Sequence, residues 1–88
     1  MAHKIEEIIT QDASAAAASF ETSGRPFLLA NDSGNGALYF RDCTEDNTAA
    51  TSANGFPVAA GTTLPFVLRA GKISVIGAKV KIMYLAEV

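Results

Sequence analysis

The 88-residue sequence predicts an all-β fold, either a small antiparallel β-sandwich or a β-barrel of about six short strands with an extended N-terminal arm. Two observations favour this class. Turn-forming residues interrupt the chain roughly every ten residues, which is the spacing of sandwiches and small barrels. Two stretches, residues 26–41 and 72–84, also have the apolar–turn–apolar pattern of a β-hairpin.

The length and composition indicate one small domain. We assign residues 1–12 to the arm and residues 13–88 to a single β domain. A chain of this size buries only about 60–65% of its unfolded surface, so its core is thin. Cys43 is the only cysteine and His3 the only histidine, so an internal disulfide is excluded and a metal site is disfavoured. Neighbouring subunits are the remaining means of reinforcement, and we therefore expect a homo-oligomer.

The charges are few but unevenly distributed. Residues 1–46 hold eight acids and three bases, and residues 47–88 hold one acid and four bases, so −5 and +3 give the net charge of −2. These groups are either solvated faces or complementary patches that meet across copies. The net charge does not favour nucleic acid, and no 18-residue apolar run or signal-peptide core is present. We expect neither a nucleic acid nor a membrane as partner.

The first twenty residues leave alternatives open. Ile5, Ile8 and Ile9 fit one face of a helix, but the same segment can lie as an extended arm. Residues 13–21 are rich in alanine, which favours a helix capped by Asp12. We prefer an extended strand there, because the following chain is β-like and small residues permit close approach of the backbone.

Residues 26–41 predict the central hairpin. We expect Leu29 to face Leu38 across a polar, glycine-bearing turn, or to face Phe40 after a slip of two residues. In both registers one face of the hairpin carries Phe27, Leu29, Leu38 and Phe40. The other face carries Leu28, Ala30, Ala37 and Tyr39 and is also mostly apolar. A hairpin with one wet face would alternate, so we expect the core to cover one face and another molecule to cover the second.

The middle of the chain predicts a long loop followed by short strands. Residues 42–54 are polar, lack an apolar period and form a long connection for so small a domain, and such loops are often functional or mobile. Residues 56–58 and 63–68 are extended. Pro57 and Pro65 cannot donate to a β-ladder, so these strands should lie at an edge or carry a bulge.

Residues 72–84 predict the second hairpin, with Gly77-Ala78 as its two-residue turn. This turn would pair Val75 with Val80 and Ile73 with Ile82, and Tyr84 would lie on the same side. The opposite side would carry Lys72, Ser74, Lys79 and Lys81. Such a cationic face is either solvated or contacts an acidic partner surface.

The sequence contains no recognisable catalytic or metal-binding pattern. A Cys–His pair would need His3, near the start of the chain, to reach Cys43. Asp42, Glu45 and Asp46 lack the spacing of a calcium loop. The glycines at 34 and 36 join two strands, whereas phosphate-binding loops precede a helix. We therefore assign no catalytic residue, cofactor or metal ligand.

The order of motifs resembles the small all-β structural proteins of tailed-bacteriophage virions. An alanine- and serine-rich lead is followed by RPFLLANDSG at 25–34, ALYFR at 37–41, ANGFPVAAG at 53–61, GKISVIG at 71–77 and VKIMYLAE at 80–87. The resemblance covers residues 13–88 and contains no catalytic motif. The lead 1–12 lies outside it, and the loop 42–54 is longer than the family pattern.

The resemblance implies a virion protein, made in the host bacterial cytoplasm, that assembles in many copies without catalysis. We expect a capsid decoration or cement subunit whose partners are other copies and other virion proteins such as the major capsid protein. A neck or tail ring component, or a receptor- or carbohydrate-binding module on a fibre, is the alternative. The candidate subunit-contact residues are Ile5, Ile8, Leu28, Tyr39, Lys72, Lys79 and Lys81.

Overall fold

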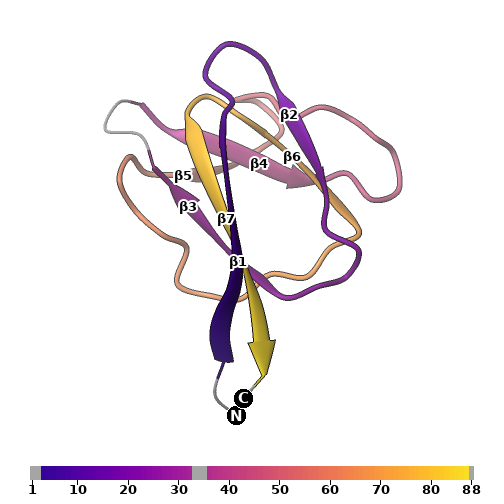
Figure 1. Cartoon of the computed structure of the whole chain (residues 1–88). Helices are drawn as coiled ribbons and strands as arrows, with labels where there is room; N and C mark the ends of the chain where they lie inside the picture. Colours follow the sequence, from indigo (N-terminus) through magenta and orange to yellow (C-terminus); the bar gives the residue numbers. More distant parts are fainter. Residues whose placement is uncertain (1–2, 33–35, 88) are drawn as a thin grey trace.

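The chain folds as a small β-sandwich of two antiparallel sheets, which confirms the predicted fold class (Figure 1). The structure is a computed structural model that describes residues 3–32 and 36–87. Within these residues it has seven strands and no helix. The strands are β1 (His3–Asp12), β2 (Ala18–Glu21), β3 (Phe27–Asn31), β4 (Leu38–Asp42), β5 (Phe56–Val58), β6 (Lys72–Ile76) and β7 (Lys79–Glu87).

The two sheets are built from strands that are distant in sequence. One sheet has the order β1-β7-β3 and the other β2-β6-β4-β5. Both predicted hairpins are therefore wrong, because β3 and β4 belong to different sheets and so do β6 and β7. Leu29 of β3 pairs with Ile82 of β7, and Phe40 of β4 pairs with Val75 of β6, so β3 and β4 do not pair with each other. Ser33, Gly34 and Asn35, which were part of the first predicted turn, lie outside the described residues.

The two hairpin predictions were wrong because the alternation of side chains does not show which strands pair. A short connection between two alternating strands can fold them side by side in one sheet or pass them across the core into opposite sheets. The same alternate residues face the core in both cases, so the alternation does not distinguish them. The inward-facing residues were accordingly predicted correctly: Phe27, Leu29, Leu38, Ile73, Val75, Val80, Ile82 and Tyr84 are all buried.

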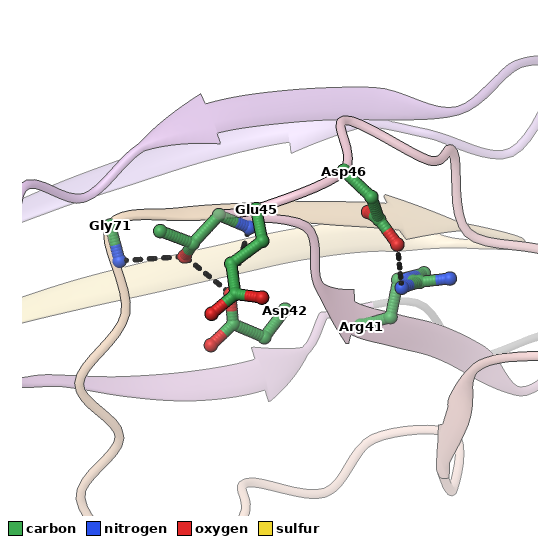
Figure 2. A pocket seen from close by; sticks show the side chains of 6 residues that line it. Arg41, Asp42, Glu45, Asp46 and Gly71 are labelled. Atoms are coloured by element: carbon green, nitrogen blue, oxygen red, sulfur yellow. Dashed lines mark hydrogen bonds and ion pairs between the residues drawn. The ribbon is translucent and has the colours of Figure 1, made fainter.

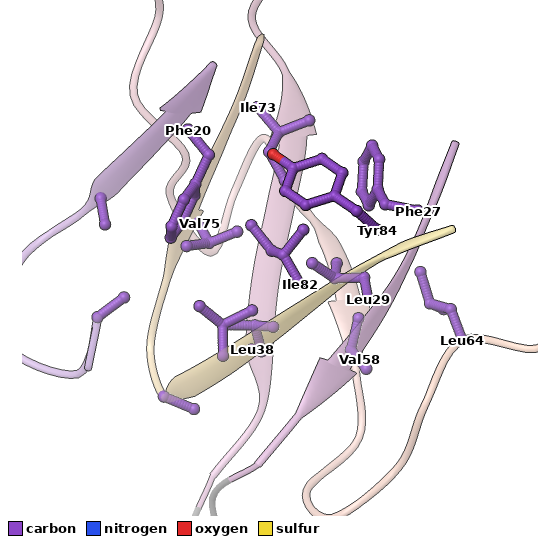
Figure 3. Close-up of a cluster of buried hydrophobic side chains, with 14 residues drawn as sticks. Phe20, Phe27, Leu29, Leu38, Val58, Leu64, Ile73, Val75, Ile82 and Tyr84 are labelled. Carbon is purple, nitrogen blue, oxygen red and sulfur yellow. The ribbon is translucent and has the colours of Figure 1, made fainter. Parts of the chain in front are cut away.

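The core lies between the two sheets. Apolar side chains from both inner faces meet there, together with Phe20 from β2 and Leu64 from the segment beside β3 (Figure 3). Phe40, which was expected on the inner face, is only partly buried but packs against this cluster. Phe27 and Tyr84 contact edge to face, with ring centroids 6.2 Å apart.

The first strand belongs to the sheet, and the separate N-terminal arm is not confirmed. β1 is an edge strand that pairs with β7 from His3 opposite Glu87 to Asp12 opposite Lys79. The N-terminal end of β1 and the C-terminal end of β7 therefore lie side by side at one end of the molecule (Figure 1). Neither a helix nor a free segment forms over residues 3–12, because the backbone of β1 hydrogen-bonds to β7.

Proline and small residues limit the regular structure elsewhere. The predicted strand at residues 13–21 forms only at β2, and residues 13–17 connect the two sheets. β5 contains Pro57 and lies at a sheet edge, as expected. Residues 63–68 form no regular strand around Pro65, but Leu64 and Leu68 exchange backbone hydrogen bonds with β3 and line its outer edge.

We predict that replacing Gly77 destabilises the fold more than replacing any other glycine. Its φ is 109°, and an added Cβ would lie 2.5 Å from the carbonyl oxygen of Ala37. Gly61 has a φ of 70° with nothing within 4 Å of an added Cβ. We expect Gly61→Ala to cost about 1–2 kcal/mol and Gly77→Ala roughly twice as much, because backbone must also move. The two costs are measured by urea unfolding. Equal losses of stability in the two variants would contradict the close approach of the Gly77 backbone to Ala37, where the chain crosses from β6 to β7.

Candidate functional site

The outer faces of the two sheets differ in how far the chain covers them. The loop 43–55 lies over the outer face of the four-stranded sheet. Its Ala50 N–H donates to Ser74 Oγ at 2.9 Å, and its Cys43 N–H donates to the carbonyl of Lys72 at 3.0 Å. Cys43, Ala50 and Ser74 are all buried as a result. The loop is therefore a structural cover for this sheet.

Thr44 fastens the start of this loop to the beginning of the neighbouring strand β6. Its Oγ1 accepts the N–H groups of Gly71 at 3.0 Å and Lys72 at 3.1 Å, and it donates to Asp42 (Figure 2). Beside it Arg41 binds Asp46 at 2.8 Å. These side chains, with Glu45 and Gly71, line a surface pocket of about 450 Å³.

Two carboxyl groups of this pocket, those of Asp42 and Asp46, have pKa values below the ordinary value. The side-chain and backbone hydrogen bonds from Thr44 lower the pKa of Asp42. The backbone hydrogen bond from Thr48, with smaller help from Arg41, lowers the pKa of Asp46. Carboxyls with lowered pKa values are poor general acids near neutral pH. Among the described residues, no group of three or more histidines, cysteines and acids is arranged to hold a metal ion.

The outer face of the three-stranded sheet carries an apolar row instead. Val80, Ile82 and Tyr84 of β7 face the core, so Met83 and Leu85 between and beyond them face outward. Antiparallel partners point the same way, and Met83 lies between Ile8 of β1 and Leu28 of β3. Ile8 is 54% exposed, while Met83 and Leu28 are half-buried.

A β-bulge in β1 extends this row. The register shifts between Ile5 and Glu7, so Glu6 is an extra residue and Ile5 lies opposite Leu85. Without the bulge Ile5 would share the inner face with Glu7 and Ile9. With it, Ile5 joins Ile8 on the outer face and is 52% exposed. Leu85 is buried but lies outside the core cluster, as expected of an outward residue.

Arg25 binds the two acids that the bulge brings together. Its guanidinium donates to Glu6 at 2.9 Å and to Glu7 at 3.2 Å, and it lies 3.9 Å from the centroid of the Tyr84 ring. The tyrosine provides a face for the cation, and the cation neutralises both carboxylates. Burial raises the pKa of the Tyr84 hydroxyl. This cluster stabilises the bulge and thereby the outward position of Ile5.

The structure brings five of the seven predicted contact residues to this one sheet. Their shared feature is an outward position on β1, β3 or β7: Ile5, Ile8, Leu28, Lys79 and Lys81. We name the outer face of β1, β7 and β3 with these residues, Met83 and Leu85 the assembly face. Tyr39 and Lys72 belong to the other sheet, so the expected single flank of Leu28 and Tyr39 does not exist.

The predicted cationic face is divided between the two sheets. Lys72 lies in the four-stranded sheet, where its Nζ donates to Asn47 at 2.7 Å and is 4.0 Å from Glu21. Lys81 lies in the other sheet and is 3.3 Å from Asp32. These lysines from the basic half of the sequence therefore pair with acids from the acidic half of the same chain.

Sequence reasoning missed Met83, Leu85 and Arg25. The alternation through Val80, Ile82 and Tyr84 already placed Met83 and Leu85 on the outward side, which they share with Lys79 and Lys81. No pattern indicated Arg25, because its position over Tyr84 depends on the bulge.

Comparisons with protein-family models, with curated proteins and with solved structures found no match. Over the part of the chain that the structure describes, no helix is long and apolar enough to cross a membrane.

Thr44→Val is expected to loosen the covering loop. Valine has the shape of threonine but cannot accept the Gly71 and Lys72 N–H groups, so we expect a loss of about 1 kcal/mol in urea unfolding at pH 7. A matched control is Thr63→Val, at an exposed threonine away from this loop, for which we expect less than about 0.5 kcal/mol.

The same variant is expected to change the acid sensitivity of the fold. Because the pKa of Asp42 is lowered on folding, its contribution to stability is present above its unfolded pKa of about 3.9 and is lost as the pH falls through the folded value. In Thr44→Val the pKa of Asp42 should rise towards its ordinary value, and the stability loss between pH 5 and about pH 2 should shrink. An unchanged NMR titration of Asp42 would contradict this account.

Proposed function

We propose that this chain is a non-enzymatic structural protein of a tailed-bacteriophage virion, which docks on the capsid shell in many copies as a decoration or cement subunit. The observation that carries the proposal is the assembly face: one sheet is covered by the chain's own loop, whereas the other presents exposed Ile5 and Ile8 beside Leu28 and Met83. Contiguous apolar surface of this kind is typical of protein interfaces.

The composition of the assembly face suits a permanent contact with protein. Its centre is apolar, and charged groups lie towards one end, where Lys81 pairs with Asp32 and Lys79 lies opposite Asp12. An apolar centre with a polar rim is the usual anatomy of a stable interface. The major capsid protein of the same virus is the partner that the motif resemblance implies.

A binding module on a fibre is the second candidate, and exposed aromatic rings favour it. Phe56 and Phe66 are 54% and 48% exposed, and Phe56 stacks obliquely on Phe40 with ring centroids 5.7 Å apart. Sugar-binding sites use such rings as apolar platforms. We rank this candidate second because Phe56 and Phe66 lie outside the long loop 42–54, and that loop contains no aromatic residue.

Co-expression with the major capsid protein of the same virus tests the proposal. Purified shells are expected to carry the chain at a fixed stoichiometry, measured by gel densitometry and electron microscopy. Leu28→Glu is expected to reduce shell binding at least tenfold, because a carboxylate would be buried against apolar surface.

The matched control is Ser19→Glu, which adds the same charge at an exposed position of β2 in the other sheet. It should bind shells as the unaltered chain does, and circular dichroism should show both variants folded. Shells that never carry the chain, or that carry the folded Leu28→Glu variant equally well, would refute the assignment.

A further inference from the structure

The terminal segment of β1, residues 3–5, is separated from the rest of the strand by the bulge. It pairs with residues 85–87 of β7, and Glu6 is the extra residue. The pairing of β3 with β7 ends at Phe27 opposite Tyr84, so beyond this point β1 and β7 continue as a two-stranded ribbon (Figure 1). A change of register in residues 3–5 would therefore leave the strands that fill the core as they are.

From this arrangement we infer that residues 3–5 have two registers on β7, and that Arg25 selects the bulged one. In the second, regular register β1 continues without a bulge, and Glu6 takes the place opposite Leu85 that Ile5 occupies in the bulged register. The inference deepens the proposed function and rests on it for one consequence alone, which is that the register sets the side chains of the assembly face.

The two registers give the assembly face different side chains. Successive residues of a strand point to opposite faces, so a slip by one residue exchanges the faces of residues 3–5. In the bulged register Ile5 points outward opposite Leu85. In the regular register Ile5 would point inward, and Lys4 and Glu6 on either side of it would point outward. The end of the assembly face at Leu85 is therefore apolar in one register and charged in the other.

Two adjacent carboxylates oppose the bulged register unless a cation neutralises them. Glu6 is unpaired at the bulge, and its carboxylate reaches the same guanidinium as the carboxylate of Glu7. The bulge therefore interrupts the ladder and holds two like charges close together. In the regular register the two side chains would point to opposite faces, which separates the charges and completes the ladder.

Arg25 supplies the cation from a turn that does not depend on β1. The Arg25 N–H donates to the carbonyl of Thr22 at 2.9 Å, and the Gly24 N–H donates to the carbonyl of Ala70 at 2.7 Å. These hydrogen bonds fix the backbone from which the guanidinium reaches the bulge. The cation is therefore in place before the terminal segment of β1 adopts either register.

The contact with Glu6 is the part of this cluster that distinguishes the two registers. Glu7 stays opposite Tyr84 in both, so its ion pair with Arg25 and the cation–π contact are common to both. The ion pair of Arg25 with Glu6, 2.9 Å long, would be lost in the regular register, where Glu6 points outward. One exposed ion pair, together with the repulsion that it offsets, corresponds to a shift of roughly three- to tenfold between the registers.

Nuclear magnetic resonance of the isolated full-length chain tests the inference. Cross-strand Overhauser effects between backbone protons of Ile5 and Leu85 report the bulged register, and those between Ile5 and Ala86 report the regular one. In Arg25→Gln the ratio of the bulged to the regular register should fall roughly three- to tenfold relative to the unaltered chain. Arg25→Lys keeps a cation beside Glu6 and should leave Ile5 opposite Leu85.

Two controls separate the register from a general loss of stability. Arg69 donates to the carbonyl of Gly24 at 3.0 Å, so Arg69→Gln removes an arginine from the same turn without altering the bulge. Ile5 should stay outward in this variant. Deletion of Glu6 removes the extra residue, so Ile5 should point outward in a regular strand with or without Arg25→Gln.

Each outcome decides the inference. It is overturned by a folded Arg25→Gln chain in which Ile5 stays opposite Leu85. It is also overturned if Ile5 loses its contacts with both Leu85 and Ala86, or if Arg25→Lys shifts the register as far as Arg25→Gln does. An Arg25→Gln chain that circular dichroism shows to be unfolded would overturn it too, because the inference confines the change to residues 3–5.

Shell binding is measured separately. Arg25→Gln should bind capsid shells less tightly, in proportion to the fall in the population of the bulged register, and deletion of Glu6 in the same chain should restore binding because Ile5 is outward again. Equal binding despite a shifted register would overturn the consequence for docking. Shells that never carry the unaltered chain would refute the proposed function but leave the register result intact. An unshifted register leaves the Leu28→Glu test intact.

Discussion

Both the core and the outer apolar surface follow from the alternation of side chains along β7. Val80, Ile82 and Tyr84 are buried in the core, while β1 and β3 hydrogen-bond to the two edges of this strand. Because successive residues point to opposite faces, the same strand that fills the core also presents Met83 and Leu85 outward. The assembly face is thus a direct consequence of a thin, two-layer fold with an apolar central strand.

The outer faces of the two sheets differ in how much of their surface the described chain covers. The loop 43–55 buries Cys43, Ala50 and Ser74 against one sheet and holds itself there through Thr44. The described chain supplies no comparable loop over the other sheet, and Ile5 and Ile8 are exposed there. The start of this loop lines the acidic pocket beside Thr44, whereas the proposed function rests on the outer face of the other sheet.

The bulge at Glu6 links local geometry to this surface. One extra residue turns Ile5 outward and places two carboxylates side by side, and Arg25 over Tyr84 neutralises them. Bulges, charges and proline also protect sheet edges from indiscriminate pairing. In the edge strand β1 the bulge and the two adjacent carboxylates of Glu6 and Glu7 are features of this kind.

The sequence alone determined the fold class, the inward-facing residues and the apolar character of Leu28, because alternation and turn chemistry act over a few neighbouring residues. It did not determine which strands pair. A turn such as Gly77-Ala78 serves a hairpin and a crossover equally well, and only packing of both sheets around one core excludes the hairpin. The gathering of Ile5, Ile8 and Leu28 on one face, and the separation of Tyr39 from them, followed from those pairings and from the bulge. Tertiary structure decided them because they depend on contacts between residues far apart in the chain.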